Sequence, residues 1–195
     1  MIICGYQGIG KSTLANTCMI EYEIPVLDLE SGNFWVDGMR SQDWYKVYAN
    51  IAIHLSQQGN IVMTSSHKAV RDYLYQLNSG ERLATIYPCI ELKDQWIEKL
   101  QDRYDISKKE KDYKALMNAK EMYEQNIRDL STQIGFDHIK LRTIDYSLET
   151  AVEAYNTIVQ MLPDGKKILH IDDCTIILKE SCRSAHPSFH VWTRR

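Results

Sequence analysis

One segment near the start of the chain constrains the fold more than any other feature. Residues 5–12 read G-Y-Q-G-I-G-K-S and match the pattern G-x-x-x-x-G-K-[ST] at every fixed position. A short apolar run, residues 1–4, precedes the segment, and a helix-like stretch, residues 11–19, follows it. Glycines let such a loop wind so that its N–H groups converge, and the new helix adds its positive dipole end. The segment therefore predicts a phosphate-binding loop between a strand and a helix.

The side chains of this loop fit the chemistry of a nucleoside triphosphate. The ammonium group of Lys11 can reach the β- and γ-phosphates, and the hydroxyl of Ser12 can bind Mg²⁺. The expected cofactors are therefore ATP and Mg²⁺. We expect nucleotide binding by the loop and the first residues of the helix, namely Gly5, Gln7, Gly8, Ile9, Gly10, Lys11, Ser12 and Thr13.

Short apolar runs alternate with amphipathic stretches along most of the chain. This alternation predicts a parallel sheet of five strands that is covered by helices on both faces. The expected strands are residues 1–4, 25–30, 60–65, 83–87 and 138–141, and the expected helices are residues 11–19, 43–58, 68–77, 96–104, 108–130 and 147–161. The pattern ends at Pro163, after which residues 166–180 predict a β-hairpin.

Composition narrows the class of protein further. The 195 residues correspond to roughly one domain, and 44% hydrophobic with 25% charged residues is typical of a soluble globular protein. No apolar run approaches the ~20 residues of a membrane span, and the first residues lack the features of a signal peptide. We therefore expect a cytoplasmic protein without a membrane partner. The net charge of −3 disfavours a dedicated nucleic-acid-binding protein.

The loop, the chain length and the five alternating strands together resemble the small P-loop kinases. This family includes the nucleoside monophosphate kinases and the shikimate and gluconate kinases, and the compact build is similar to kinases carried by bacteriophages. The resemblance implies a three-layer α/β P-loop NTPase fold with strand order 2-3-1-4-5. It also implies a kinase domain over residues 1–162 with a lid at about 103–128. Residues 163–195 would form a C-terminal hairpin extension and a tail.

Acidic residues close the second expected strand, where ligands bind in open α/β sheets. The resemblance implies that Asp28 orients or deprotonates the acceptor hydroxyl, or holds Mg²⁺ beside Ser12, with Glu30 as a second acid. A solvated loop carboxylate is the alternative for both. The third expected strand ends in residues 64–67, T-S-S-H, without the carboxylate that many P-loop enzymes keep there. This departure makes Asp28 more important.

The acceptor-binding residues are expected at the same edge of the sheet. Trp35 offers a surface for stacking on a base or sugar, and Ser66 and His67 offer hydrogen bonds to a phosphate. Arg71 resembles the arginine with which monophosphate kinases bind the phosphate of the acceptor. Structural roles stay open for each of them: packing for Trp35, helix capping for Ser66 and a surface ion pair for Arg71.

The region after the fourth strand corresponds to the lid of the family. Arg103 and Arg128 are the expected lid arginines, which would neutralise charge on the transferring phosphoryl group. A solvated helical surface is the alternative there. The C-terminal residues His170, Cys174, Cys182, His186 and His190 have the ligand types of a zinc site but not its spacing. A packed hairpin is favoured instead, through which the chain could form a homodimer.

The sequence thus predicts a Mg-ATP-dependent phosphotransferase that acts on a nucleotide, a nucleoside or another small-molecule acceptor. Lys11, Asp28 and Arg103 are its expected catalytic residues. One alternative is a phage-type kinase whose acceptor hydroxyl lies on a polynucleotide or a modified base of DNA, which the negative charge disfavours. Another is a regulatory ATPase without an acceptor, which the missing carboxylate after the third strand favours slightly.

Overall fold

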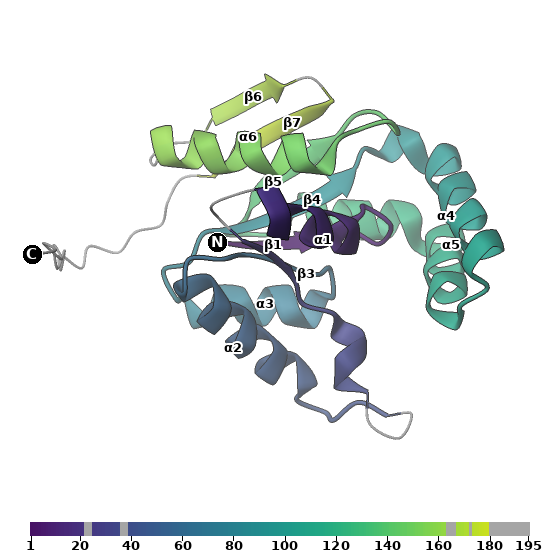
Figure 1. Ribbon diagram of the computed structural model, residues 1–195, viewed down its shortest axis with the longest axis horizontal. Helices are drawn as coiled ribbons and strands as arrows, with labels where there is room; N and C mark the ends of the chain where they lie inside the picture. Colours follow the sequence, from purple (N-terminus) through teal and green to yellow (C-terminus); the bar gives the residue numbers. More distant parts are fainter. Residues whose placement is uncertain (22–24, 36–38, 163–166, 172, 180–195) are drawn as a thin grey trace, which may run out of the picture.

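The computed structural model describes residues 1–21, 25–35, 39–162, 167–171 and 173–179, in which one sheet carries helices on both faces (Figure 1). The strands are β1 (Ile2–Gly5), β2 (Val26–Asp28), β3 (Ile61–Ser65), β4 (Leu83–Pro88), β5 (Asp137–Leu141), β6 (Lys167–Ile171) and β7 (Cys174–Leu178). The helices are α1 (Lys11–Glu21), α2 (Trp44–Gln57), α3 (Lys68–Leu77), α4 (Lys93–Ser107), α5 (Glu110–Ser131) and α6 (Leu148–Met161). No helix in these ranges combines the length and apolar character that a membrane span requires.

The sheet confirms the predicted α/β class and strand order, and it corrects the predicted strand number. Its seven strands follow the order β2-β3-β1-β4-β5-β7-β6. β1 to β5 pair in parallel in the order 2-3-1-4-5. β7 pairs antiparallel with β5, and β6 pairs antiparallel with β7. The hairpin was expected as an extension beside a five-stranded sheet, but it continues that sheet, because β5 would otherwise present an unpaired edge.

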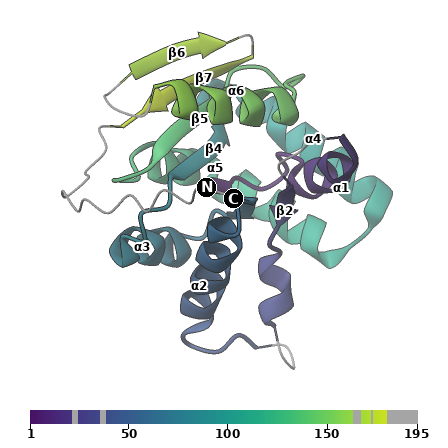
Figure 2. The same ribbon diagram turned by 60° about the vertical axis from the view of Figure 1, so that its left-hand side comes forward.

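The helices form one layer on each face of the sheet (Figures 1 and 2). Ile3 of β1 packs into the cluster that contains side chains of α1 and α6. Ile2 and Cys4 point to the opposite face and pack with side chains of α2 and α3. Thr85 of β4 is in register with Cys4, so it shares that face, and its hydroxyl donates to the carbonyl of Leu130 in α5. α5 therefore covers the same face as α2 and α3.

The α4–α5 pair projects beyond the sheet (Figure 1). The buried positions of α5 recur every three or four residues and form one apolar stripe: Leu116, Ala119, Tyr123, Ile127 and Leu130. The turn between the two helices is closed by Asp112, which is 4% exposed. Its carboxylate accepts a hydrogen bond from Ser107 Oγ at 2.5 Å and pairs with Arg103 Nη2 at 2.6 Å. Residues 103–128, where the sequence predicts a lid, thus begin in a helical hairpin whose turn is closed by a buried carboxylate.

The C-terminal hairpin is tied to the sheet through a buried carboxylate. Asp137, which is 3% exposed, begins β5. Its Oδ2 accepts from Arg82 Nε at 2.6 Å and from the Tyr155 hydroxyl at 2.7 Å. Its Oδ1 accepts from the backbone N–H of Lys179, directly after β7, at 2.7 Å. One side chain therefore joins β4, α6 and the end of the hairpin.

Candidate active site

The glycine-rich loop lies between β1 and α1, as the sequence predicts. Gly8 and Gly10 have φ values of +82° and +93°, which side chains other than that of glycine adopt only with strain. At Gly8 a Cβ atom would also lie 2.8 Å from Leu100 Cδ2 of α4. The second constraint comes from packing, since the loop is pressed against α4. Glycine at position 8 therefore meets two requirements, a positive φ angle and close packing of the loop against α4.

The α4–α5 hairpin holds the loop by further contacts. Trp96 Nε1 of α4 donates to the carbonyl of Gln7 at 3.1 Å, and Gln7 Nε2 donates to the carbonyl of Ala115 in α5 at 2.8 Å. The ring of Tyr6 lies against Trp96 and meets Tyr123 edge to face. Gln7, predicted to bind nucleotide, thus connects the loop with both α4 and α5.

Lys11 lies at the centre of the site. Its Nζ donates to the carbonyls of Gly5 at 3.1 Å and Tyr6 at 3.3 Å. Burial lowers the pKa of Lys11 below its ordinary value, and the carboxylates of Asp28 and Glu30 oppose this effect only in part.

Ser12 and Asp28 form the closest polar pair of the site. Ser12 Oγ donates to Asp28 Oδ2 at 2.5 Å, and Glu30 Oε1 lies 3.5 Å from the same hydroxyl. Asp28 Oδ1 is buried and has no hydrogen-bond partner among the described residues. A hydroxyl and a carboxylate with an unused oxygen form the type of hard oxygen donor set that Mg²⁺ prefers. These residues therefore fit a bound Mg-nucleotide.

The ends of β2 and β3 are fixed to each other by Tyr48 of α2. Its hydroxyl donates to the carbonyl of Leu29 at 2.5 Å and accepts from the N–H of Ser65 at 2.9 Å. β3 ends in hydroxyl side chains, as the sequence shows, and Ser65 Oγ is buried without a partner in the described part of the chain. The carboxylate beside Ser12 thus comes from β2, across β3, which explains how the site can lack an acid on β3.

The α4–α5 hairpin contributes cations to this region. Lys111 Nζ lies 3.6 Å from Glu30 Oε1, and Lys114 Nζ lies 5.8 Å from the centroid of the Trp35 ring. Arg103 is close enough to Lys11 for its charge to lower the pKa of that lysine. Arg103 itself pairs with Asp112 in the turn between α4 and α5, so the direct contact of this hairpin with the acids of the site is made by Lys111, which no motif in the sequence indicates.

Two other arginines lie elsewhere than expected. Arg128 sits in the last turn of α5 and pairs with Glu124 at 3.4 Å. At 1.5 Å per residue it lies roughly 25 Å along the helix from Lys111, so it does not share the contact that Lys111 makes with Glu30. Arg71 is 2% exposed and donates to the carbonyl of Ser66 and to Gln133 Oε1, both at 3.0 Å. Its position supports the turn after β3 and does not match an open acceptor contact.

Arg40, which the sequence did not single out, lies near the ends of β2 and β3, where it contacts Ser31 and His67. Its Cζ is 4.2 Å from the Trp44 ring centroid and 4.9 Å from that of Trp35. Its Nη1 is 3.4 Å from Nε2 of His67. Partial desolvation, followed by the charges of Arg40 and Arg71, lowers the pKa of His67, so the neutral ring can accept from Arg40. The spacing of Trp35, Arg40 and Trp44 in the sequence is the only signal of this cluster, and no motif contains it.

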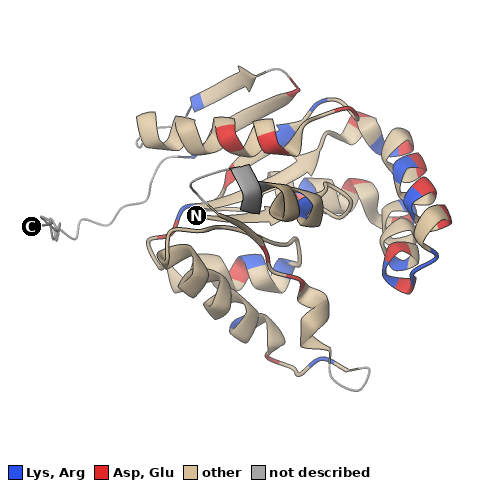
Figure 3. Cartoon of the chain, in the orientation of Figure 1, with Lys and Arg blue, Asp and Glu red and all other residues tan. Residues whose placement is uncertain are grey.

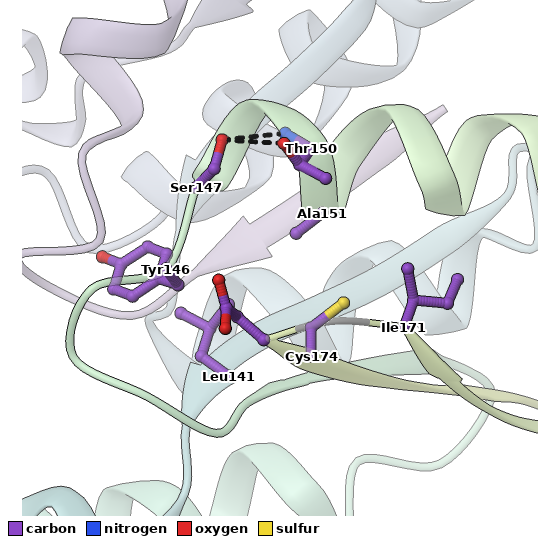
Figure 4. Close-up of a pocket in the computed structure, with 8 residues that line it drawn as sticks. Leu141, Tyr146, Ser147, Thr150, Ala151, Ile171 and Cys174 are labelled. Atoms are coloured by element: carbon purple, nitrogen blue, oxygen red, sulfur yellow. Dashed lines mark hydrogen bonds between the residues drawn. The ribbon is translucent and has the colours of Figure 1, made fainter.

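A cavity of about 220 Å³ lies farther along the same sheet edge, between the start of α6 and the tip of the hairpin (Figure 4). Its lining comes from Leu141, Tyr146, Ser147, Thr150, Ala151, Ile171, Asp173 and Cys174. Ser147 caps α6 by accepting from the N–H of Thr150, and Leu141 pairs with Cys174 in the sheet. The hairpin thus contributes to the carboxyl edge of the sheet that also carries the phosphate loop.

The structure offers no support for a zinc site in the residues it describes. No group of three or more metal-binding side chains occurs in those ranges. His170 Nδ1 lies 2.9 Å from the hydroxyl of Thr175, and Cys174 is buried. Cys182, His186 and His190 lie outside the described residues.

The chain is similar to known proteins in structure rather than in sequence. Neither a scan against protein-family models nor a search of curated proteins finds a match. A shikimate kinase from Bacteroides thetaiotaomicron is similar in structure, with a TM-score of 0.47, 13% identity, and coverage of 83% of this chain and 96% of that one. An uncharacterised protein from Eubacterium ventriosum has a TM-score of 0.42, 16% identity, and coverage of 83% and 96%. A tunicamycin resistance protein from Deinococcus radiodurans has a TM-score of 0.47, 15% identity, and coverage of 83% and 95%.

Proposed function

We propose that the protein is a Mg-ATP-dependent phosphotransferase of the nucleotide-kinase type. The observation that carries the proposal is the pair formed by Ser12 and Asp28, whose oxygens are 2.5 Å apart beside the loop lysine. A loop that only bound a phosphate would need no carboxylate at this place. A carboxylate beside a P-loop hydroxyl fits a metal-bound triphosphate whose terminal phosphoryl group is transferred.

Each residue of the site has a role in this reaction. The loop N–H groups and Lys11 bind the phosphates and stabilise charge that develops during transfer. Ser12 and Asp28 would hold the metal, and Asp28 is also the group that could take the proton of the acceptor hydroxyl. Arg103 would neutralise charge from the lid side. Bound Mg-ATP supplies the phosphoryl group and part of the charge neutralisation.

The acceptor is proposed to lie over the carboxyl ends of β2 and β3. Glu30, Trp35, Ser66 and His67 surround this region together with Arg40. Trp35 is 50% exposed and can stack on a planar ring, which fits a nucleotide or nucleoside. Lys111 and Lys114 face the same region from the lid, so the acceptor would be covered when the lid is in place.

Neither alternative gains support from the structure. Acidic and basic side chains are interspersed along α4 and α5 (Figure 3), whereas a polynucleotide requires a continuous basic surface. The regulatory ATPase was favoured by the missing carboxylate on β3, and Asp28 now supplies that carboxylate from β2. We therefore retain the kinase with a small acceptor.

The proposal is tested by measuring ADP release from Mg-ATP, alone and with a panel of nucleosides, nucleotides and short DNA strands. ADP release that depends on a small acceptor, with phosphate recovered on that acceptor, would support the proposal. Equal ADP release without any acceptor would identify an ATPase. Transfer of labelled phosphate only to DNA would identify a polynucleotide kinase. No binding of Mg-ATP at all would remove the nucleotide assignment.

A further inference from the structure

The hydrogen-bond ladder between β2 and β3 runs in a regular register up to the site. The N–H of Ile61 donates to the carbonyl of Pro25 at 3.1 Å, and the N–H of Leu29 donates to the carbonyl of Met63 at 2.9 Å. The bonds of a parallel ladder are evenly spaced along the two strands. In this register the next bond would run from the N–H of Ser65 to the carbonyl of Leu29.

The hydroxyl of Tyr48 occupies the place of that bond. It accepts from the N–H of Ser65 at 2.9 Å and donates to the carbonyl of Leu29 at 2.5 Å. Because an oxygen atom stands between them, the two backbone groups lie farther apart than the ~2.9 Å of a direct bond. Burial raises the pKa of Tyr48, and the charge of Asp28 adds to this effect, so the hydroxyl keeps its proton. Tyr48 therefore joins the two strands and at the same time holds them apart.

The side chain of Tyr48 is fixed by packing. It is fully buried, and its ring meets the rings of Phe34 and Trp44 edge to face, at centroid distances of 5.2 and 5.7 Å. Phe34 belongs to the 3₁₀ helix η1 (Ser31–Phe34), which begins directly after Glu30. A side chain in a close-packed interior has little room to shift. Through Tyr48, α2 thus holds both the end of β2 and the turn that follows it.

The backbone that Tyr48 holds carries the acids of the site. Leu29 lies between Asp28, whose Oδ2 is 2.5 Å from Ser12 Oγ, and Glu30, whose Oε1 is 3.5 Å from the same hydroxyl. The ladder part of β2 is only three residues long, Val26–Asp28. A change in the spacing of β2 and β3 at this point would therefore move the Asp28 carboxylate relative to Ser12.

We propose that Tyr48 is a positioning residue, which holds the end of β2 at the distance from β3 that sets Asp28 beside Ser12. The proposal rests on the proposed kinase function, in which these two side chains hold the metal of the nucleotide. Tyr48 acts through the backbone at Leu29. Tyr48→Phe tests this role, because it removes the hydroxyl and keeps the ring in its packing.

Nucleotide binding tests the proposal without turnover. Mn²⁺ accepts the oxygen ligands of Mg²⁺, and calorimetry measures the affinity of the protein for ADP with and without Mn²⁺. We expect Tyr48→Phe to weaken Mn-ADP binding about threefold, within the effect of one hydrogen bond, and to leave metal-free ADP binding unchanged. Tyr45→Phe is the matched control, since it removes a hydroxyl from the same helix where the ring meets Tyr73. Equal Mn-ADP affinity in the two variants would overturn the role of Tyr48.

Amide exchange in the unaltered protein gives a second measurement, which holds even if Tyr48→Phe does not fold. Coupling between two equilibria is reciprocal, so a contact that favours metal binding is itself stabilised by the metal. We expect the N–H of Ser65 to exchange about threefold more slowly, by nuclear magnetic resonance, with Mg-ADP than with ADP alone. Equal exchange rates would contradict the proposal.

Kinetics distinguish positioning from a contribution to stability alone. With an acceptor found in the panel, Tyr48→Phe is expected to lower kcat about tenfold and to change both KM values by a few-fold at most. In the Asp28→Asn protein the same substitution should have no further effect on kcat, because Tyr48 acts through that carboxylate. A tenfold loss in both backgrounds, or no loss in either, would overturn the proposal.

The outcomes separate this role from the kinase function. If Mn-ADP binds and depends on Tyr48 but no acceptor is phosphorylated, the kinase function fails and the positioning of Asp28 stands. If an acceptor is phosphorylated equally well by Tyr48→Phe and Tyr45→Phe, the kinase function stands and the role of Tyr48 fails. If the unaltered protein binds no Mn-ADP, both are overturned.

Discussion

Lys11 is the single residue on which the nucleotide assignment depends most. Within the described structure its Nζ bonds only to loop carbonyls, so its removal takes no support from the core. We expect Lys11→Ala to lower kcat by ~10²–10³, the usual effect of removing one preorganised charge. The melting temperature should change by only a few degrees. Steady-state kinetics at saturating Mg-ATP, with Lys93→Ala as control, measure this effect, and an unchanged kcat would disprove the role.

A substitution of Asp28 tests phosphoryl transfer separately from nucleotide binding. We expect Asp28→Asn to keep a contact with Ser12 but to lose the negative charge that holds the metal and accepts a proton. Its kcat should fall by ~10² or more, while ATP affinity changes by a few-fold. Glu30→Gln is the matched comparison, because Glu30 lies farther from Ser12 at 3.5 Å and pairs with Lys111. A larger loss in Glu30→Gln than in Asp28→Asn would reverse the two roles.

Two arginines near the ends of β2 and β3 show why residues beyond the motif are hard to predict. Position in the chain suggested Arg71, one turn into the helix after β3, yet its guanidinium turns inward to Ser66 and Gln133. The position of Arg40 could not be predicted because it is set by contacts with Trp35, Trp44 and His67, which only the tertiary fold brings together. Local spacing predicts a loop that binds through its own backbone, but not a cluster built from several elements.

At the scale of elements, periodicity predicted the strands and helices well, because each is buried on a defined face. The α5 stripe was visible in the sequence for this reason, whereas the buried face of α2 runs through Tyr48, Ala49, Ala52 and Ile53 and leaves the apolar Val47 and Ile51 exposed. The place of the hairpin was not visible. Apolar and polar residues alternate along its two strands in the same way whether the hairpin is separate from the sheet or pairs with it. Pairing with β5 is fixed by long-range contacts such as those of Asp137.

Asp137 provides a test of how the hairpin is attached. Its carboxylate accepts from Arg82, from Tyr155 and from the N–H of Lys179, and it is 3% exposed. We expect Asp137→Asn to lower the free energy of unfolding by about 3 kcal/mol, because Arg82 then loses its buried counter-charge. Asp72→Asn, which breaks the surface pair with Lys68, should cost under about 1 kcal/mol. Chemical denaturation compares the two, and equal losses would mean that the network does not hold the sheet edge.

For the molecule as a whole, the sequence predicted the fold more completely than the site. The phosphate loop defines the start of the sheet, and right-handed crossovers between parallel strands then leave few arrangements. The hydrophobic core follows from the same pattern, with Ile3 facing one helical layer and Ile2 the other. The hydrophobic pattern could not predict that the α4–α5 hairpin contacts the phosphate loop through Gln7 and Trp96. That contact joins segments about ninety positions apart.

The stability of the whole molecule should depend on pH through a buried histidine. His138 of β5 is 1% exposed, and its Nδ1 lies 2.8 Å from the hydroxyl of Thr85. Burial, followed by the charge of Lys179, lowers the pKa of His138 from 6.5 to about 4, against smaller opposing effects of Asp137 and Leu130. The folded protein thus keeps this ring neutral, while the unfolded chain takes up a proton below pH 6.5. The contribution of the neutral His138 ring to the free energy of unfolding is present above pH 6.5 and is lost as the pH falls towards 4.

We therefore expect the free energy of unfolding to fall between pH 7.5 and pH 5, by about 2 kcal/mol from His138 alone. His138→Gln removes the titrating ring. Its stability at pH 7.5 will be lower, but the part of the pH dependence due to this ring should disappear. His54→Gln, on the exposed face of α2, should keep the full dependence. Urea denaturation of the three proteins at both pH values measures the differences. If His138→Gln lost as much stability on acidification as the parent protein, the ring would not be held neutral by burial between α5 and the sheet.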